Sequence, residues 1–200
     1  MAENRTYQPL TMVPLSRGPG FCRPAAPPVD RVELDDPAER VMTDLDRVAA
    51  ATIYPKATLE EAEQRMIASG VRMLLVNDAE RCVVGVITAT DILGEKPMQM
   101  IQRTGGRRED LQVEDLMTAL GDLQVMRLSD VKRARVGDVV ATLNEAGRQH
   151  LLVVDDADEL EDIRGIFSST QLARQLGRPV EIDGRAQSFA ELEAALAESA

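Results

Sequence analysis

The sequence has little of several features on which common classes of protein depend. Aromatic residues make up 2% of its 200 residues, with three Phe, two Tyr and no Trp, so the chain lacks the stacking platforms that single-stranded nucleic acids use. Acids outnumber bases by 34 to 23, and the resulting formal net charge of −11 repels the phosphate backbone of DNA and RNA. We therefore predict that the protein does not bind nucleic acid.

Cysteine and long apolar runs are also scarce. Cys22 and Cys82 are the two cysteines, and without a CxxC spacing they predict neither a disulfide framework nor a zinc site. No apolar run approaches the roughly 18 residues of a membrane span, and the N-terminus lacks the regions of a signal peptide. These absences predict a protein of the reducing cytoplasm that does not engage a membrane.

Proline is concentrated near the N-terminus, where seven of the ten prolines lie between Pro9 and Pro37. Proline lacks an amide donor and biases the preceding residue toward extended conformations. We therefore interpret residues 1–39 as a proline-rich arm.

From about residue 40 the sequence repeats itself. Met42-Thr43 recurs as Met117-Thr118, and two longer matches follow at offsets of 77 and 80 residues, 59–78 with 136–155 and 85–93 with 165–173. A repeat of this length indicates two copies of one supersecondary unit. We place the copies at residues 40–97 and 113–178, with a hydrophilic, flexible linker at 98–112 and a C-terminal extension at 179–200.

Each copy predicts the order helix, strand, strand, helix. Apolar residues at helical spacing precede Gly70 and Gly147, which occupy the usual position of a helix stop. The apolar runs 73–76 and 151–154 are long enough for strands and too short for helices, and a second strand and a helix start follow each. In the extension, residues 180–183 predict an edge strand, and a terminal amphipathic helix is predicted from Ser188. The expected fold class is α/β (α+β).

This pattern resembles a tandem CBS-domain pair, or Bateman module, of the stand-alone kind, over about residues 40–178. The likeness rests on three features found twice in the same order, namely the Met-Thr start, the strand sequences LLVND and LLVVD, and a motif of Gly and two apolar residues that continues as Thr-x-x-Asp in the first copy and as Ser-x-x-Gln in the second. It implies two repeats packed about a pseudo-twofold axis, two clefts between their sheets, and a homodimer. Members of the family bind AMP, ADP, ATP or S-adenosylmethionine, so the resemblance implies a non-catalytic regulatory module that signals to a protein target.

Thr88 and Asp91 are the first candidate ligand residues, because they start a helix directly after a buried strand. Exposed amides and the helix dipole favour phosphate there, and the resemblance implies that the Asp91 carboxylate accepts hydrogen bonds from both ribose hydroxyls. The same spacing also fits a capping box, in which the two side chains satisfy their own backbone. Both interpretations stay open at this point.

The second copy carries Ser168 and Gln171 at the corresponding positions. Glutamine still supports a cap but offers a neutral amide in place of a carboxylate. We therefore expect a nucleotide in the cleft of Asp91, with the cleft of Gln171 empty or in contact with phosphates.

The resemblance adds four further cleft positions, which are Ile53, Arg72, Met73 and His150. His150 is the single histidine, and no second metal ligand or nucleophile stands near it at motif spacing. The acidic run 155–162 lacks the calcium-loop pattern and predicts a hydrated loop. We predict no metal site and no catalysis.

A second hypothesis from a different class remains, in which the protein is a ligandless homodimeric scaffold. The fit to a capping box and the glutamine at position 171 both favour it.

Overall fold

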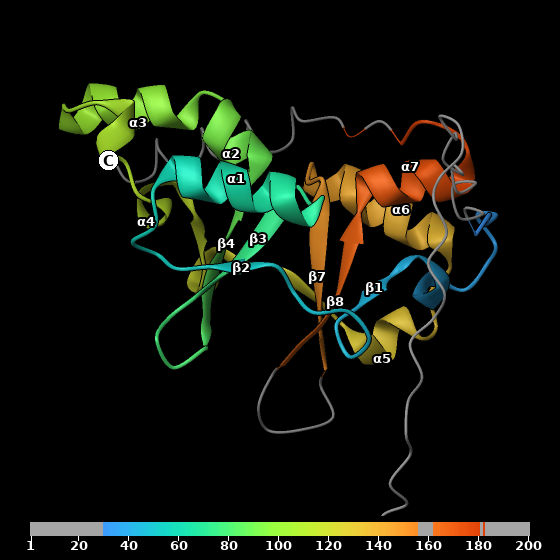
Figure 1. Cartoon of the computed structure of the whole chain (residues 1–200). Helices are drawn as coiled ribbons and strands as arrows, with labels where there is room; N and C mark the ends of the chain where they lie inside the picture. Colours follow the sequence, from blue (N-terminus) through green and yellow to red (C-terminus); the bar gives the residue numbers. More distant parts are fainter. Residues whose placement is uncertain (1–29, 156–161, 181, 183–200) are drawn as a thin grey trace, which may run out of the picture.

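The computed structural model describes residues 30–155, 162–180 and 182, and in this part of the chain it shows a mixed α/β protein with two four-stranded sheets (Figure 1). The first sheet has the order β2-β3-β4-β5 and the second the order β1-β8-β7-β6. In each sheet the two central strands are antiparallel and one outer strand joins in parallel. The strands are β1 (Thr43–Asp44), β2 (Thr52–Ile53), β3 (Met73–Asn77), β4 (Val83–Thr88), β5 (Thr118–Ala119), β6 (Val125–Arg127), β7 (His150–Asp155) and β8 (Asp162–Ser168).

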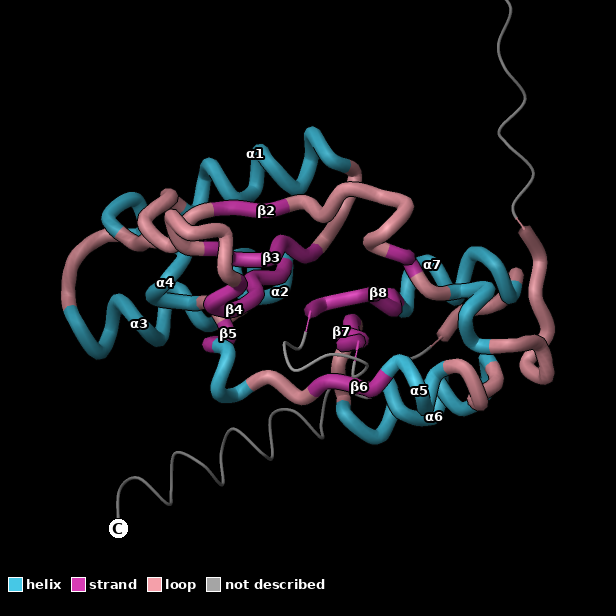
Figure 2. The backbone as a smooth tube through the Cα atoms, turned by 90° about the horizontal axis from the view of Figure 1, so that it is seen from below, coloured by secondary structure: helices cyan, strands magenta, loops and turns pink. Residues whose placement is uncertain are grey.

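The predicted order of helix, strand, strand, helix is confirmed in both copies. Helices α1 and α6 begin the units and end at Gly70 and Gly147, whose φ values of 65° and 61° lie in the left-handed region that glycine adopts without strain. Figure 2 shows the strands in the middle of the molecule, with α1, α5 and α6 at the periphery. The α-helices are α1 (Leu59–Ser69), α2 (Ala89–Leu93), α3 (Lys96–Thr104), α4 (Val113–Leu116), α5 (Leu128–Val131), α6 (Val136–Ala146) and α7 (Ser169–Leu176), and the 3-10 helices are η1 (Ala38–Val41), η2 (Arg108–Asp110) and η3 (Leu120–Asp122).

The linker predicted at 98–112 is more ordered than expected, because it contains most of α3 and all of η2. Pro97 stands at the start of α3, where its missing amide costs no hydrogen bond. The polar composition that suggested a flexible connector therefore belongs in part to the solvated face of a helix.

The two copies exchange their first strands. The Met-Thr pair of the first copy leads into β1, where Thr43 pairs with Ile166 of β8, and that of the second copy leads into β5, where Thr118 pairs with Val86 of β4. A glycine at each crossing permits the close approach: a Cβ added at Gly165 would lie 2.4 Å from the sulfur of Met42. The recurring motif thus ties each half to the other.

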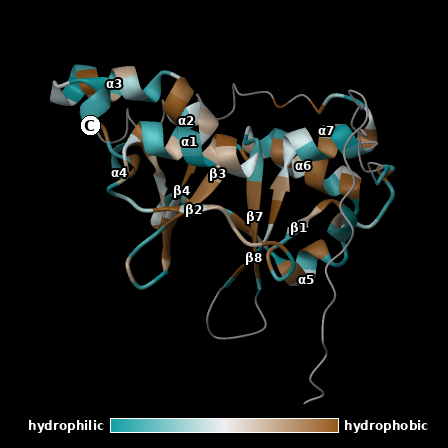
Figure 3. Ribbon diagram, viewed as in Figure 1, coloured by the Kyte–Doolittle hydropathy of each residue, from teal (hydrophilic) through white to brown (hydrophobic). Residues whose placement is uncertain are grey.

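Three apolar clusters hold this arrangement together. One fills the half formed by the second sheet, around Phe167 and Leu143, and another fills the half formed by the first sheet, around Leu74 and Ile87. The third lies where the two sheets meet. Figure 3 shows that hydrophobic residues concentrate on the central strands, whereas the loops are largely hydrophilic. The members of the third cluster are Met73, Leu75, Val86 and Leu152.

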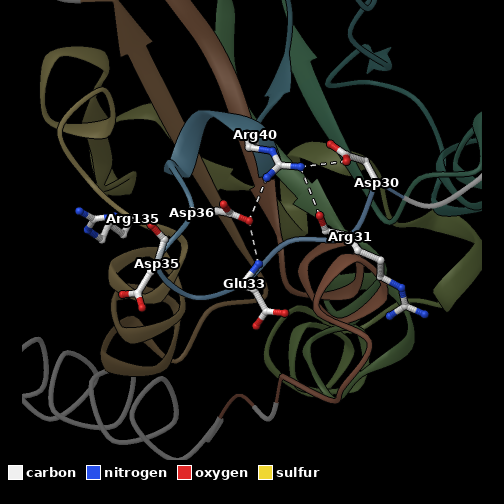
Figure 4. Close-up of polar contacts among 7 residues, drawn as sticks. All are labelled: Asp30, Arg31, Glu33, Asp35, Asp36, Arg40 and Arg135. Carbon is white, nitrogen blue, oxygen red and sulfur yellow. Dashed lines mark hydrogen bonds and ion pairs between the residues drawn. The ribbon is translucent and has the colours of Figure 1, made fainter.

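The described end of the predicted arm packs onto the second half. Val32 is 4% exposed within that core, and its amide donates to the Gln175 carbonyl over 3.2 Å. Arg40 holds the segment in shape through ion pairs of 2.9 Å with Asp30 and with Asp36 (Figure 4). Residues 30–39 therefore contribute to a core, while residues 1–29 lie outside the described part of the chain.

Candidate ligand clefts

Two clefts lie between the halves, and each joins the helix start of one copy to the strand start of the other. The larger, which we call the Asp91 cleft, has a volume of about 330 Å³. It combines residues around α2 with the segment that leads into β7. Its lining residues are Met73, Val86, Thr88, Thr90, Asp91, Gly94, Glu95, Lys96, Gln99, Thr118, Leu123, Gln124, Gly147, Arg148, Gln149, His150, Leu152 and Ile182.

The smaller, which we call the Gln171 cleft, has a volume of about 220 Å³. It combines the start of α7 with the segment that leads into β3, and Met73 and His150 line both clefts. Its lining residues are Thr43, Gly70, Val71, Arg72, Met73, His150, Ile166, Ser168, Thr170, Gln171 and Arg174.

Asp91 forms the capping box that the sequence allowed. Its Oδ2 atom accepts hydrogen bonds from the Thr88 amide at 2.8 Å and from the Thr88 hydroxyl at 2.6 Å, and the Asp91 amide donates back to that hydroxyl. The residue is 5% exposed, and its Oδ1 atom accepts from Nζ of Lys96 at 2.7 Å. The capping interpretation is therefore confirmed, while a role of Asp91 toward a ribose stays a prediction.

The Asp91 cleft offers a mixture of charges over an apolar floor. Its acids and bases balance, since Asp91 and Glu95 are matched by Lys96 and Arg148. The floor comes from the cluster between the sheets, to which Met73 belongs. A cleft of this kind can hold a ligand that combines an apolar ring, hydroxyl groups and negative charge.

Gln171 does not behave as expected, and the prediction that it supports a cap is wrong. The Ser168 side chain forms no capping hydrogen bond at the start of α7. Instead, Oε1 of Gln171 accepts from the Thr43 hydroxyl at 3.0 Å. The physical reason is the strand exchange, which brings β1 next to β8 and gives the longer glutamine side chain a partner across the two copies.

His150 lies at the wall that the two clefts share, directly across from Ser168 in the sheet. Burial and the positive charge of Arg72 lower its pKa to about 4, and the charge of Asp91 opposes this shift. The imidazole is therefore neutral near pH 7, and it lines both clefts without adding a charge to either.

The structure divides the predicted ligand residues between the two clefts, with Met73 and His150 in both, and leaves one residue apart. Thr88 and Asp91 line one cleft, whereas Arg72, Ser168 and Gln171 line the other. Ile53 lines neither, because its side chain is 9% exposed in the core of the first half.

Four charged cleft residues were missed in the sequence, namely Glu95, Lys96, Arg148 and Arg174. Arg174 follows Gln171 by one helical turn, so helical spacing placed it on the same face. For Glu95, Lys96 and Arg148 the sequence held no comparable signal, because each reaches its cleft through the tertiary fold.

Within the described ranges, no three His, Cys, Asp or Glu side chains gather where they could hold a metal ion. Residues 156–161 of the acidic run lie outside those ranges. None of the helices in the described part of the chain is long and apolar enough to cross a membrane.

Comparison with known proteins finds one sequence domain and several similar folds. The sequence model of the CBS domain matches residues 31–97. A conserved protein from Pyrococcus horikoshii superimposes with a TM-score of 0.52 at 25% identity, over 75% of this chain and 98% of that one. The CBS domain protein NE2398 gives a TM-score of 0.51 at 21% identity, over 70% and 96%.

A third structure is CBSX2 in complex with AMP, a CBS-pair protein known from Arabidopsis thaliana, which has a TM-score of 0.49 at 22% identity over 70% of this chain and 94% of that one. A search of curated protein sequences finds no match.

The fold thus defines a class, a pair of α/β repeats that exchange their first strands and leave a cleft on each side of the shared wall. The sequence match over residues 31–97 shows a CBS domain in the first repeat, and the fold of the chain is consistent with a CBS pair.

Proposed function

We propose that the protein is a non-catalytic regulatory module that binds an adenine nucleotide (AMP, ADP or ATP) or S-adenosylmethionine in the Asp91 cleft and signals its occupancy to a separate protein. The observation that carries this proposal is the composition of the cleft, in which a buried carboxylate, two cations and an apolar floor lie between the two halves. The family resemblance supports the same class of ligand.

Binding would exchange one partner of Asp91. Its Oδ2 atom belongs to the cap, but its Oδ1 atom contacts Lys96 alone among the contacts of the described residues. Lys96 is 33% exposed and has a long, flexible stem. A ribose hydroxyl would take its place at Oδ1, and the released ammonium group together with Arg148 would pair with phosphate. The apolar floor would receive the base.

Signalling would follow from the position of the cleft. Because its wall contains residues of both copies, a ligand there bridges the two halves. A bound ligand favours the arrangement of the two halves for which it has the higher affinity. A partner protein that binds one arrangement more tightly then binds more or less of the protein when the ligand is present.

The scaffold hypothesis has an observation of its own. Ile67 on α1, Leu93 on α2 and Met98 on α3 are 67%, 66% and 59% exposed, and large apolar residues on the outer face of neighbouring helices are typical of a surface that a second copy covers. With Oδ2 of Asp91 committed to its cap, a ligandless homodimer is the alternative function.

A thermal-shift assay distinguishes the two. A nucleotide at a hundred times its dissociation constant should stabilise the protein by about 2.7 kcal/mol, which raises the melting temperature by roughly 5–11 °C. Asp91→Asn should abolish this rise. Asp138→Asn is the matched control, because Asp138 caps α6 through the Arg135 amide at 2.8 Å and lines neither cleft.

Asp138→Asn should cost about 1 kcal/mol of unliganded stability, and Asp91→Asn should cost more, because Asp91 is buried and also pairs with Lys96. The control keeps the response to nucleotide. The absence of a shift with AMP, ADP, ATP and S-adenosylmethionine at millimolar concentration, together with a dimer in sedimentation velocity, would favour the scaffold.

A further inference from the structure

The Gln171 cleft differs from the Asp91 cleft in its charge. Arg72 and Arg174 line it, and none of its lining residues is an Asp or a Glu. The Asp91 cleft, by contrast, is lined by two acids and two bases. In a chain with a net charge of −11, the smaller cleft is therefore a local positive site.

The two arginines are also unpaired. No residue of the described ranges forms an ion pair with Arg72 or Arg174, although acids outnumber bases by 34 to 23 in the chain. A guanidinium group is always charged near neutral pH, and its forked donors match the oxygen atoms of a phosphate group. Two such groups at one cleft favour an anionic ligand.

The neutral groups of the cleft are arranged as donors as well. Because the Thr43 hydroxyl occupies Oε1 of Gln171, the remaining polar group of that side chain is its amide NH₂, which only donates. The Ser168 hydroxyl, which makes no cap, has a proton to give. An acidic acceptor for ribose hydroxyls, as Asp91 would provide in the other cleft, is missing from this lining.

The volume of the Gln171 cleft also favours a small anion. Its volume of about 220 Å³ lies below the roughly 300–1,000 Å³ of pockets that enclose a ligand of drug size. A compact anion therefore suits it better than a whole nucleotide.

We propose that the Gln171 cleft binds a phosphate-type oxyanion through Arg72, Arg174 and the Gln171 amide, without recognising a ribose or a base. This inference goes beyond the proposed function and does not depend on it, because the residues that carry it line the other cleft. It gives the protein two unlike ligand sites that share the side chains of Met73 and His150.

The experiment uses the full-length protein and inorganic phosphate as the probe. Phosphate is titrated at pH 7.5 and constant ionic strength, and the ring signals of His150, the single histidine of the chain, are followed by NMR together with the melting temperature. Phosphate should shift the ring signals, because Arg72 and His150 line the same cleft. Adenosine, which has no phosphate, should leave the affinity for phosphate unchanged, even where adenosine in the Asp91 cleft shifts the His150 signals by itself.

Two variants and a matched control assign the site. Arg174→Met should weaken phosphate binding roughly ten- to hundredfold, since it removes a charge-assisted contact. Gln171→Glu should weaken it to a similar extent by replacing the donor with a carboxylate. Arg103→Met, which removes an exposed arginine that lines neither cleft, should bind phosphate as the original protein does. Arg174 is exposed, so its replacement should leave the unliganded melting temperature unchanged.

The proposal would be overturned if phosphate gave no response at millimolar concentration, if Arg174→Met and Gln171→Glu bound it normally, or if adenosine displaced it. Glycerol phosphate distinguishes the source of the anion: tighter binding than inorganic phosphate supports a phosphate group on a larger compound, and equal binding supports free phosphate. A failure of the phosphate proposal would not change the expected nucleotide response of the Asp91 and Asp138 variants. The two proposals can therefore be refuted independently.

Discussion

The burial of His150 should make the stability of this protein depend on pH in a defined window. Its pKa is lowered to about 4 in the folded protein, against about 6.5 in an unfolded chain. As the pH falls below 6.5, His150 takes up a proton in the unfolded chain but stays neutral in the folded protein. The free energy of unfolding therefore decreases toward acid pH. The loss continues until the pH passes through about 4, where both states are protonated.

The size of the effect follows from the two pKa values. Between pH 8 and pH 5 the unfolded imidazole becomes almost fully protonated, whereas the folded one stays largely neutral, and the linkage costs about 2 kcal/mol. For a domain of this size that loss corresponds to a fall of roughly 4–8 °C in melting temperature. Below pH 4 the full contribution reaches about 3 kcal/mol.

The assay compares the protein with His150→Gln, which keeps a polar side chain but cannot titrate. Urea unfolding at pH 8, 6.5 and 5 gives the free energy of unfolding of each, and carboxylates that titrate in both chains cancel in the difference. The variant should lose about 2 kcal/mol less than the original protein over this range. Parallel curves for the two chains, or a His150 pKa near 6.5 in an NMR titration, would refute the reasoning.

Two further predictions concern the framework around the clefts. Thr58→Ala removes the capping box of α1 and should lower the free energy of unfolding, measured with urea, by about 1 kcal/mol. An unchanged free energy of unfolding would show that solvent replaces the cap fully. Gly85→Ala should destabilise the protein more than Gly165→Ala, because the added Cβ meets the backbone oxygen of Thr118 at 2.5 Å in the first case and the flexible side chain of Met42 in the second. Equal losses would show that the side chain is held as firmly as the backbone.

The elements that could be predicted from the sequence are those determined by residues close together in the chain. Helix α1 could be placed because apolar residues recur at helical spacing and Gly70 ends it, and β3 because a short apolar run follows. The repeat extended the same reading to the second copy. What could not be predicted is the exchange of β1 and β5, because a strand of two residues has no periodicity of its own and its partner lies far away in the sequence.

The candidate site also has one part that the sequence determined and another that depended on the tertiary structure. The sequence alone determined that Thr88 and Asp91 stand at a helix start after a buried strand. Both the strand and the cap depend on residues that are neighbours in the sequence. Only the tertiary structure decided that Asp91 shares its cleft with Arg148, and that Arg72 belongs instead with Gln171. The physical reason is that each cleft forms where the two halves pack, and which side chains face it depends on how those halves are turned toward one another.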